Sequence, residues 1–173
     1  PHNVFHLRKP VVAAPDGPLP EPEVPSRLVE ALGVVTDDDL APLRAAAAES
    51  REAFAAAFFD ATAAKPHLGA VAPVVLYRTL GPTLPDGAAS AALLWGAAHR
   101  CAMSFESSVR RAGFTGEGLA LGESLFEGIL AGHHGVSFSV DEWDDVPTRV
   151  RTADGRIDVH LPEMVDELRT LAG

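Results

Sequence analysis

Apolar residues recur with a helical period over most of the chain, and this pattern predicts a mainly α fold. Glycine and proline indicate where the helices end, because glycine adopts the left-handed backbone of a helix terminus and proline donates no main-chain hydrogen bond. Pro73 is expected to kink the helix that contains it. Together these signals predict helices over about residues 21–32, 37–64, 66–80, 88–103, 104–112, 118–131 and 162–171.

The pattern changes most sharply between Gly118 and Val146. A helical apolar stripe stops at Gly132, and apolar and small polar residues then alternate from Val136 to Val140, which predicts a short strand with one buried face. Residues 157–161 alternate in the same way, so the two segments are expected to pair. We therefore expect a mainly α fold, a single helical domain of six or seven helices with a small two-stranded β element near the C-terminal third.

Residues 1–25 contain frequent prolines and predict an extended arm with a short strand over Asn3 to Leu7. Such an arm normally lies across a surface, and residues 26–173 form the helical domain in this interpretation. A first residue of proline rather than methionine suggests a processed chain or a piece of a longer one. The helix over 88–103 is apolar on nearly every side and is expected to be the central buried element.

Composition and charge narrow the classes of partner. The chain has 173 residues, enough for one domain with a continuous core, and 47% of them are hydrophobic. The formal net charge of −10 makes this an acidic protein and excludes nucleic acid as an expected partner, because phosphate backbones repel it. The sequence contains neither an apolar run long enough to span a membrane nor a signal-peptide core, so we expect no membrane partner and a cytoplasmic location.

Few residues form a recognisable chemical motif. The single cysteine, Cys101, excludes an intrachain disulfide, and its apolar helix predicts a buried, inert thiol. The motifs GxGxxG, GxxxxGK[ST], GxSxG and CxxC are absent. His99 is expected to be a core histidine, bonded to a carbonyl or to a carboxylate such as Glu106. Glu123 and Glu127 lie one helical turn apart and suggest either a paired-carboxylate site or, with no histidine expected opposite them, a solvated edge.

His133 and His134 occupy the corner before the expected strand, and four carboxylates follow over residues 141–145. One interpretation is a metal or proton-transfer site that uses both histidines and Asp141, because imidazoles and carboxylates are common metal ligands. The other is a solvated loop followed by the acidic first turn of a helix. Adjacent histidines on an extended loop point to opposite sides, and no HxxxH or HExxH spacing occurs, which favours the second interpretation.

Four phrases occur in order along the chain: NVFHLRKPV with PLPEPEV, VLYRTLGPTLPDGAASAALLWGAAHRCA, GEGLALGESLFEGILAGHHGVSFSVDEWDDV and RTADGRIDVHLPEMVDEL. Together they resemble the interior of actinobacterial molybdopterin-dependent oxidoreductases, which bind a bis-guanine-dinucleotide molybdenum cofactor. The family's cysteine cluster, metal-ligating residue and glycine-rich dinucleotide cradles have no counterpart here. GHHG also departs from the Ser-Gly type of corner, so no role is carried over to His133 or His134.

The resemblance implies a non-catalytic scaffold portion or separate chain of such an oxidoreductase, which shapes access to a cofactor bound mainly elsewhere. Molybdopterin guanine dinucleotide and molybdenum are then expected in the complete enzyme and not on this chain alone, and its partners are the remaining domains or subunits. A stand-alone helical binding or self-association module is the alternative. A metal-dependent enzyme that uses His133, His134 and Asp141 is a third hypothesis.

Overall fold

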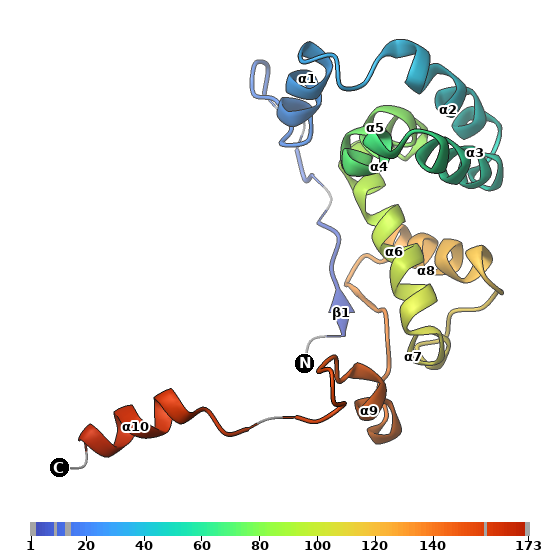
Figure 1. Cartoon of the computed structure of the whole chain (residues 1–173). Coiled ribbons are helices and arrows are strands. Elements are labelled where there is room, and N and C mark those ends of the chain that lie inside the picture. Colours follow the sequence, from blue (N-terminus) through green and yellow to red (C-terminus); the bar gives the residue numbers. More distant parts are fainter. Residues whose placement is uncertain (1–2, 9, 13–14, 158, 172–173) are drawn as a thin grey trace. The chain divides into compact units, whose positions relative to one another are not determined.

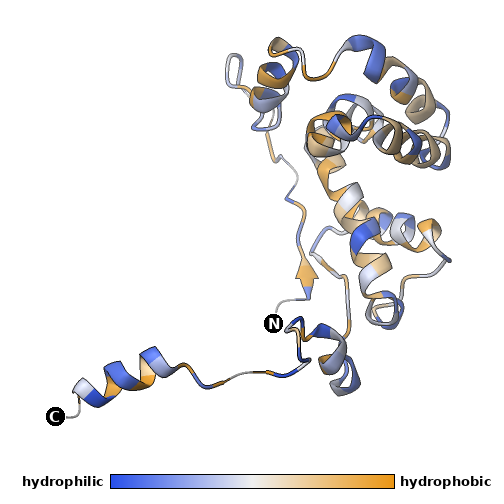
Figure 2. Cartoon of the chain, in the orientation of Figure 1, coloured by the Kyte–Doolittle hydropathy of each residue, from blue (hydrophilic) through white to orange (hydrophobic). Residues whose placement is uncertain are grey.

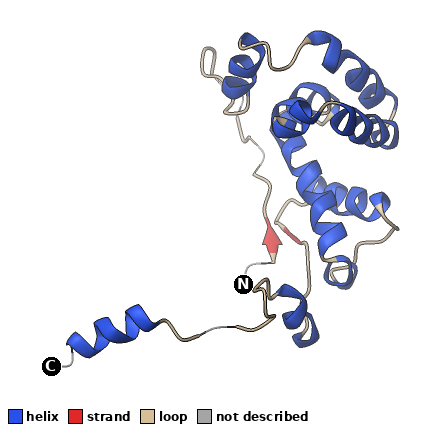
Figure 3. Ribbon diagram, in the orientation of Figure 1, coloured by secondary structure: helices blue, strands red, loops and turns tan. Residues whose placement is uncertain are grey.

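The computed structural model describes residues 3–8, 10–12, 15–157 and 159–171, and it divides the chain into two units, Pro1–Val140 and Asp141–Gly173. The described residues form ten α-helices and one two-stranded antiparallel sheet (Figures 1 and 3). The predicted helical class is confirmed, whereas the predicted number of six or seven helices is too low. The predicted boundary between residues 25 and 26 stays a prediction.

The first unit contains eight of the described helices. They are α1 (Glu23–Ala31), α2 (Asp37–Glu49), α3 (Arg51–Ala64), α4 (Pro66–Ala70), α5 (Ala72–Thr79), α6 (Ala92–Ser104), α7 (Glu106–Arg111) and α8 (Leu119–Ala131). The described part of the second unit contains α9 (Val146–Arg149) and α10 (Pro162–Leu171). No helix among the described residues combines the length and apolar character that crossing a membrane requires.

Two helices that the sequence predicts as continuous are each broken in the structure. The helix over 37–64 is interrupted at Ser50, whose backbone is extended and whose Oγ accepts a 3.0 Å hydrogen bond from the backbone N–H of Ala53. Serine therefore ends α2 and caps the N-terminus of α3. The helix over 66–80 is interrupted at Val71, two residues before Pro73, because proline cannot donate to the preceding turn. These breaks account for part of the low helix count.

The predicted strand pairing is wrong. Strand β2 (Val136–Ser137) pairs antiparallel with β1 (Val4–Phe5), with Val4 opposite Ser137. Neither residue 157 nor residues 159–161 form a strand, and residue 158 lies outside the described residues. Phe5 and Phe138 pack against the helical core, which explains why the N-terminal segment lies on this chain's own surface.

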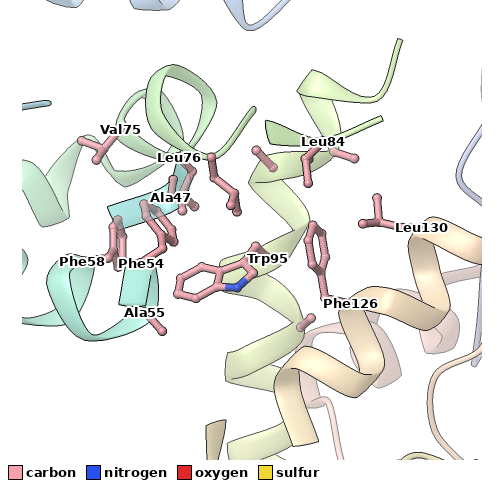
Figure 4. Packing of buried hydrophobic residues seen from close by; sticks show 14 of the residues in the cluster. Ala47, Phe54, Ala55, Phe58, Val75, Leu76, Leu84, Trp95, Phe126 and Leu130 are labelled. Carbon is pink, nitrogen blue, oxygen red and sulfur yellow. The ribbon is translucent and has the colours of Figure 1, made fainter. Parts of the chain in front are cut away.

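Helix α6 is central to the core of the first unit, as the sequence predicts, and it packs against α5, α7 and α8. Much of it is hydrophobic (Figure 2). Trp95 is completely buried, and its indole meets the rings of Phe54 and Phe58 edge-on at centroid distances of 5.3 and 5.5 Å. Figure 4 shows the Trp95 ring extending from α6 toward these two residues of α3. The small residues Ala92, Ala98 and Ala102 let neighbouring elements approach α6 closely.

An ion-pair network joins α1 to α5. Arg78 donates to Glu23 at 2.6 Å and to Glu30 at 2.7 Å, and Arg27 donates to Glu23 at 2.7 Å. The hydrogen bonds from Arg78 and then Arg27 lower the pKa of Glu23 to about 2. Because ionised Glu23 is bound tightly only in the folded chain, its ionisation stabilises the fold.

Replacing Glu23 by glutamine should therefore flatten the dependence of stability on pH. The native pKa is depressed, so the wild-type advantage is complete above pH 4.5 and is lost as the pH falls to about 2. Urea denaturation across that range checks the expectation. In an Arg78→Gln background the same substitution should change the pH dependence less. An equal change in both backgrounds would contradict the role given to Arg78.

Candidate functional site

A polar cluster lies where α3, α6 and α8 meet. Trp95 and His99 stand one turn apart on α6 and reach the same carboxylate, that of Glu123 on α8. The Trp95 Nε1–H donates to Glu123 Oε1 at 2.5 Å, and His99 Nε2 lies 3.1 Å from the same oxygen. Arg51 of α3 donates from Nε to Glu123 Oε2 at 2.9 Å. Three helices are thus joined through one carboxylate.

Arg51 also pairs with Glu127, one turn beyond Glu123 on α8. The elements opposite this glutamate pair therefore supply Arg51 from α3 and His99 from α6, and the expectation that no histidine lies opposite them is wrong. The Glu123 side chain is only 23% exposed, so the predicted solvated edge is wrong for it, whereas Glu127 is 53% exposed. His99 is a core histidine bonded to a carboxylate, as predicted, but the carboxylate is that of Glu123, and the suggested Glu106 pairs with Arg110 instead.

The surroundings of Glu123 favour its ionised form. Burial raises the pKa of this carboxyl, but hydrogen bonds from His99 and Trp95, with the charge of Arg51, outweigh burial and leave the pKa lowered. Glu123 is therefore a carboxylate at neutral pH. Both of its oxygens accept hydrogen bonds from protein groups, which suits it to joining helices.

His99 is held in a fixed orientation within this cluster. Its side chain is 2% exposed, and its Nδ1 has no hydrogen-bond partner among the described residues. A Cβ at position 122 would lie 2.3 Å from Nδ1, so the backbone of Gly122 occupies the space next to that nitrogen. The neutral tautomer with the proton on Nε2 fits this geometry, since it donates to Glu123 and leaves only a lone pair unmatched. A general base needs its second nitrogen directed at a reacting group, and here it faces a helix.

The structure places His133 and His134 on the surface, directly after Gly132. Asp141 belongs to the second unit, where it pairs with Arg149. Within the ranges that the structure describes, no three His, Cys, Asp or Glu side chains are grouped closely enough to hold a metal ion. A metal site at this corner stays a prediction.

The acidic residues after Val140 begin a helix, as predicted. The backbone N–H of Glu142 donates to the Asp145 carboxylate at 2.8 Å, in a reciprocal capping arrangement. A short 3₁₀ turn over Trp143–Asp145 then leads into α9. These carboxylates stabilise a helix N-terminus.

Cys101 is half-buried, where the sequence predicts full burial. It lines an apolar cavity of about 150 Å³ together with Phe5, Leu125 and Phe138. The thiol thus faces apolar side chains from both strand segments and from α8.

The sequence contains part of the signal for the polar cluster, namely the helical spacing of Trp95 and His99 and of Glu123 and Glu127. No local pattern indicates that Arg51 joins them, because that contact spans 72 residues. Comparisons with protein-family models, with curated proteins and with solved structures find no match to this chain.

Proposed function

We propose that this chain is a non-catalytic scaffold portion, or a separate chain, of a molybdopterin-dependent oxidoreductase, where it shapes access to a cofactor bound mainly elsewhere. The four sequence phrases that resemble this family are the reason for proposing this type of enzyme. In the complete enzyme the molybdopterin cofactor would supply two-electron redox chemistry. The remaining domains or subunits would be the partners of this chain.

The main support for a scaffold role is that Glu123 holds helices together. This carboxylate receives hydrogen bonds from Trp95, His99 and Arg51 and so joins three helices. A catalytic carboxylate has to present an oxygen or a proton to a substrate, whereas both Glu123 oxygens are engaged by the protein. The arrangement supports a rigid structural part.

Exposed apolar surface supports association with other polypeptide. On α10 the side chains of Met164, Leu168 and Leu171 follow helical spacing and are 58%, 64% and 76% exposed. No residue in the described range of α10 is buried. An amphipathic helix with an open apolar stripe is stabilised when another surface covers that stripe.

Sedimentation of the purified chain tests this role. The wild-type chain should self-associate through exposed apolar surface, and Leu168→Glu should weaken that association about tenfold, because a charge enters the stripe. Thr170→Glu places the same charge at an exposed α10 position outside the stripe and should have little effect. Equal behaviour of the two variants would contradict a role for the stripe.

Elemental analysis and pterin fluorescence of the same preparation test whether this chain binds the cofactor by itself. The scaffold proposal expects neither molybdenum nor pterin on the purified chain, and detection of both would overturn it.

The alternative function is a stand-alone helical binding or self-association module, which the apolar stripe of α10 also favours. A discrete, well-folded, cofactor-free dimer would support that alternative, whereas open-ended association would support the scaffold proposal.

A further inference from the structure

The first unit contains a groove of about 420 Å³ beside α6, bounded by residues of α3, α4 and α5. Its volume lies within the range of small-molecule sites, roughly 300–1,000 Å³. Most of its walls are apolar or aromatic. The lining includes Phe58, Phe59, Trp95, Gly96, Arg100 and Met103. The polar cluster around Glu123 lies behind this wall, since Trp95 and His99 belong to both.

On the α6 side, the floor of the groove lacks a side chain at one position. Leu93, Gly96, Arg100 and Met103 follow one another at helical spacing and share one stripe of the helix. Gly96 contributes no side chain there, and a Cβ at this position would meet only Leu76 Cδ1, at an ordinary 3.5 Å. The groove therefore persists because residue 96 is small.

Arg100 is unusual among the arginines of helices α1 to α8. It is exposed and has no hydrogen bond or ion pair among the described residues. Every other arginine in helices α1 to α8 donates to a carboxylate, a hydroxyl or a backbone oxygen; these are Arg27, Arg44, Arg51, Arg78, Arg110 and Arg111. The chain has 24 acidic residues, yet this guanidinium remains available beside an apolar groove.

Aromatic rings pack against one another in the wall of the groove that Arg100 also lines. Trp95 contacts Phe58 and Phe59 at centroid distances of 5.5 and 5.9 Å, and Phe59 is 37% exposed. Met103, one turn beyond Arg100, is 63% exposed and adds a polarisable thioether that packs well against rings. Flat apolar walls favour a flat aromatic ligand, and an unpaired guanidinium favours an acidic group on it.

We infer that this groove is a binding site for a flat aromatic molecule that carries one acidic group. The aromatic part lies against the exposed Phe59 and Met103 side chains, with the buried Phe58 and Trp95 rings behind them, and the acidic group pairs with the Arg100 guanidinium. The assignment is independent of the scaffold proposal, because it uses only residues of the first unit and requires no partner chain.

The probe for this site is anilinonaphthalene sulfonate, an aromatic anion, with neutral N-phenylnaphthylamine as its uncharged counterpart. The chain contains two tryptophans, and Trp143 is 90% exposed, so a Trp143→Phe background leaves Trp95 as the sole tryptophan donor. Binding in the groove should produce energy transfer from Trp95 to the probe. Probe binding without energy transfer would place the probe elsewhere and would overturn the inference.

Arg100→Gln should weaken binding of the anionic probe about tenfold and change binding of the neutral probe by less than about twofold. Arg110→Gln removes the same charge from an arginine outside the groove and should leave both affinities unchanged. Equal weakening by the two variants would show a general charge effect and overturn the assignment.

Gly96→Leu provides a second, independent test because it fills the floor of the groove. Leucine is a better helix former than glycine, so the thermal unfolding temperature should stay constant or rise while binding of both probes is lost. Undiminished energy transfer from Trp95 in this variant would contradict the proposed site. Should Gly96→Leu unfold, the comparison of Arg100→Gln with Arg110→Gln still decides between the outcomes.

Discussion

Replacing Glu123 by leucine is expected to lower the free energy of unfolding by about 2–4 kcal/mol. The substitution removes the acceptor shared by Trp95 and His99 and one acceptor of Arg51. Trp95 is completely buried and His99 is 2% exposed, so water cannot readily replace the lost oxygen. The cost is dominated by polar groups left without partners.

Urea denaturation of a matched series checks this expectation. Glu123→Gln keeps an oxygen acceptor but loses the charge, and it should cost about half as much as leucine, roughly 1–2 kcal/mol. Glu127→Gln changes the more exposed partner of Arg51 and should cost less than about 1 kcal/mol. The central role of Glu123 would be refuted by a leucine variant no less stable than Glu127→Gln.

Gly122→Ala is expected to destabilise the chain by about 2–3 kcal/mol, although alanine ordinarily favours helices. Its Cβ would lie 2.3 Å from Nδ1 of His99 and 2.7 Å from Cγ of the same ring. The ring cannot turn away cheaply, since it contacts Trp95 at a centroid distance of 4.3 Å and bonds to Glu123. The clash therefore has to be relieved by moving α6 and α8 apart.

Gly96→Ala is the matched control for this prediction. A Cβ there meets only Leu76, at 3.5 Å, so the variant should be neutral or up to about 1 kcal/mol more stable. In a His99→Ala background the ring is absent, and Gly122→Ala should then cost little. Thermal or urea unfolding of the four chains gives the coupling directly, and additive effects would rule out contact with His99 as the cause.

Helix content and the central position of α6 follow from residue patterns alone. Residues 88–103 are apolar on nearly every side, and a helix of this kind is stable only when it is surrounded. Thr36 and Asp39 cap each other at the N-terminus of α2. This cap and the acidic start of α9 are likewise local, because their hydrogen bonds connect residues three apart. Such features depend on short-range geometry that the sequence states directly.

The breaks inside predicted helices are harder to foresee. Ser50 lies within an apolar helical pattern that continues on both sides, and the break at this residue lets α2 pack against α3. A serine side chain caps a helix well, but it also tolerates a helix interior when solvent-exposed. Tertiary contacts decide between two local states of similar free energy.

Strand pairing and the ligand-binding residues are harder still to predict from the sequence. The alternation over residues 157–161 matches that over Val136–Val140, yet β2 pairs with β1 from the other end of the first unit. Period-two alternation identifies a face and does not identify a partner. The pairing of Arg110 with Glu106 connects residues four apart and is visible in the sequence, whereas only the structure shows that no carboxylate of another described helix reaches Arg100.

The sequence by itself determined the helical class, the buried central helix and the capped helix starts, since periodicity and capping act over three or four residues. Only the tertiary structure decided that Arg51 and Glu123 meet, that Gly122 has to remain glycine, and that a groove opens beside Arg100. Each of these depends on contacts between segments far apart in the chain. Their free energy arises from packing and desolvation, which no local pattern encodes.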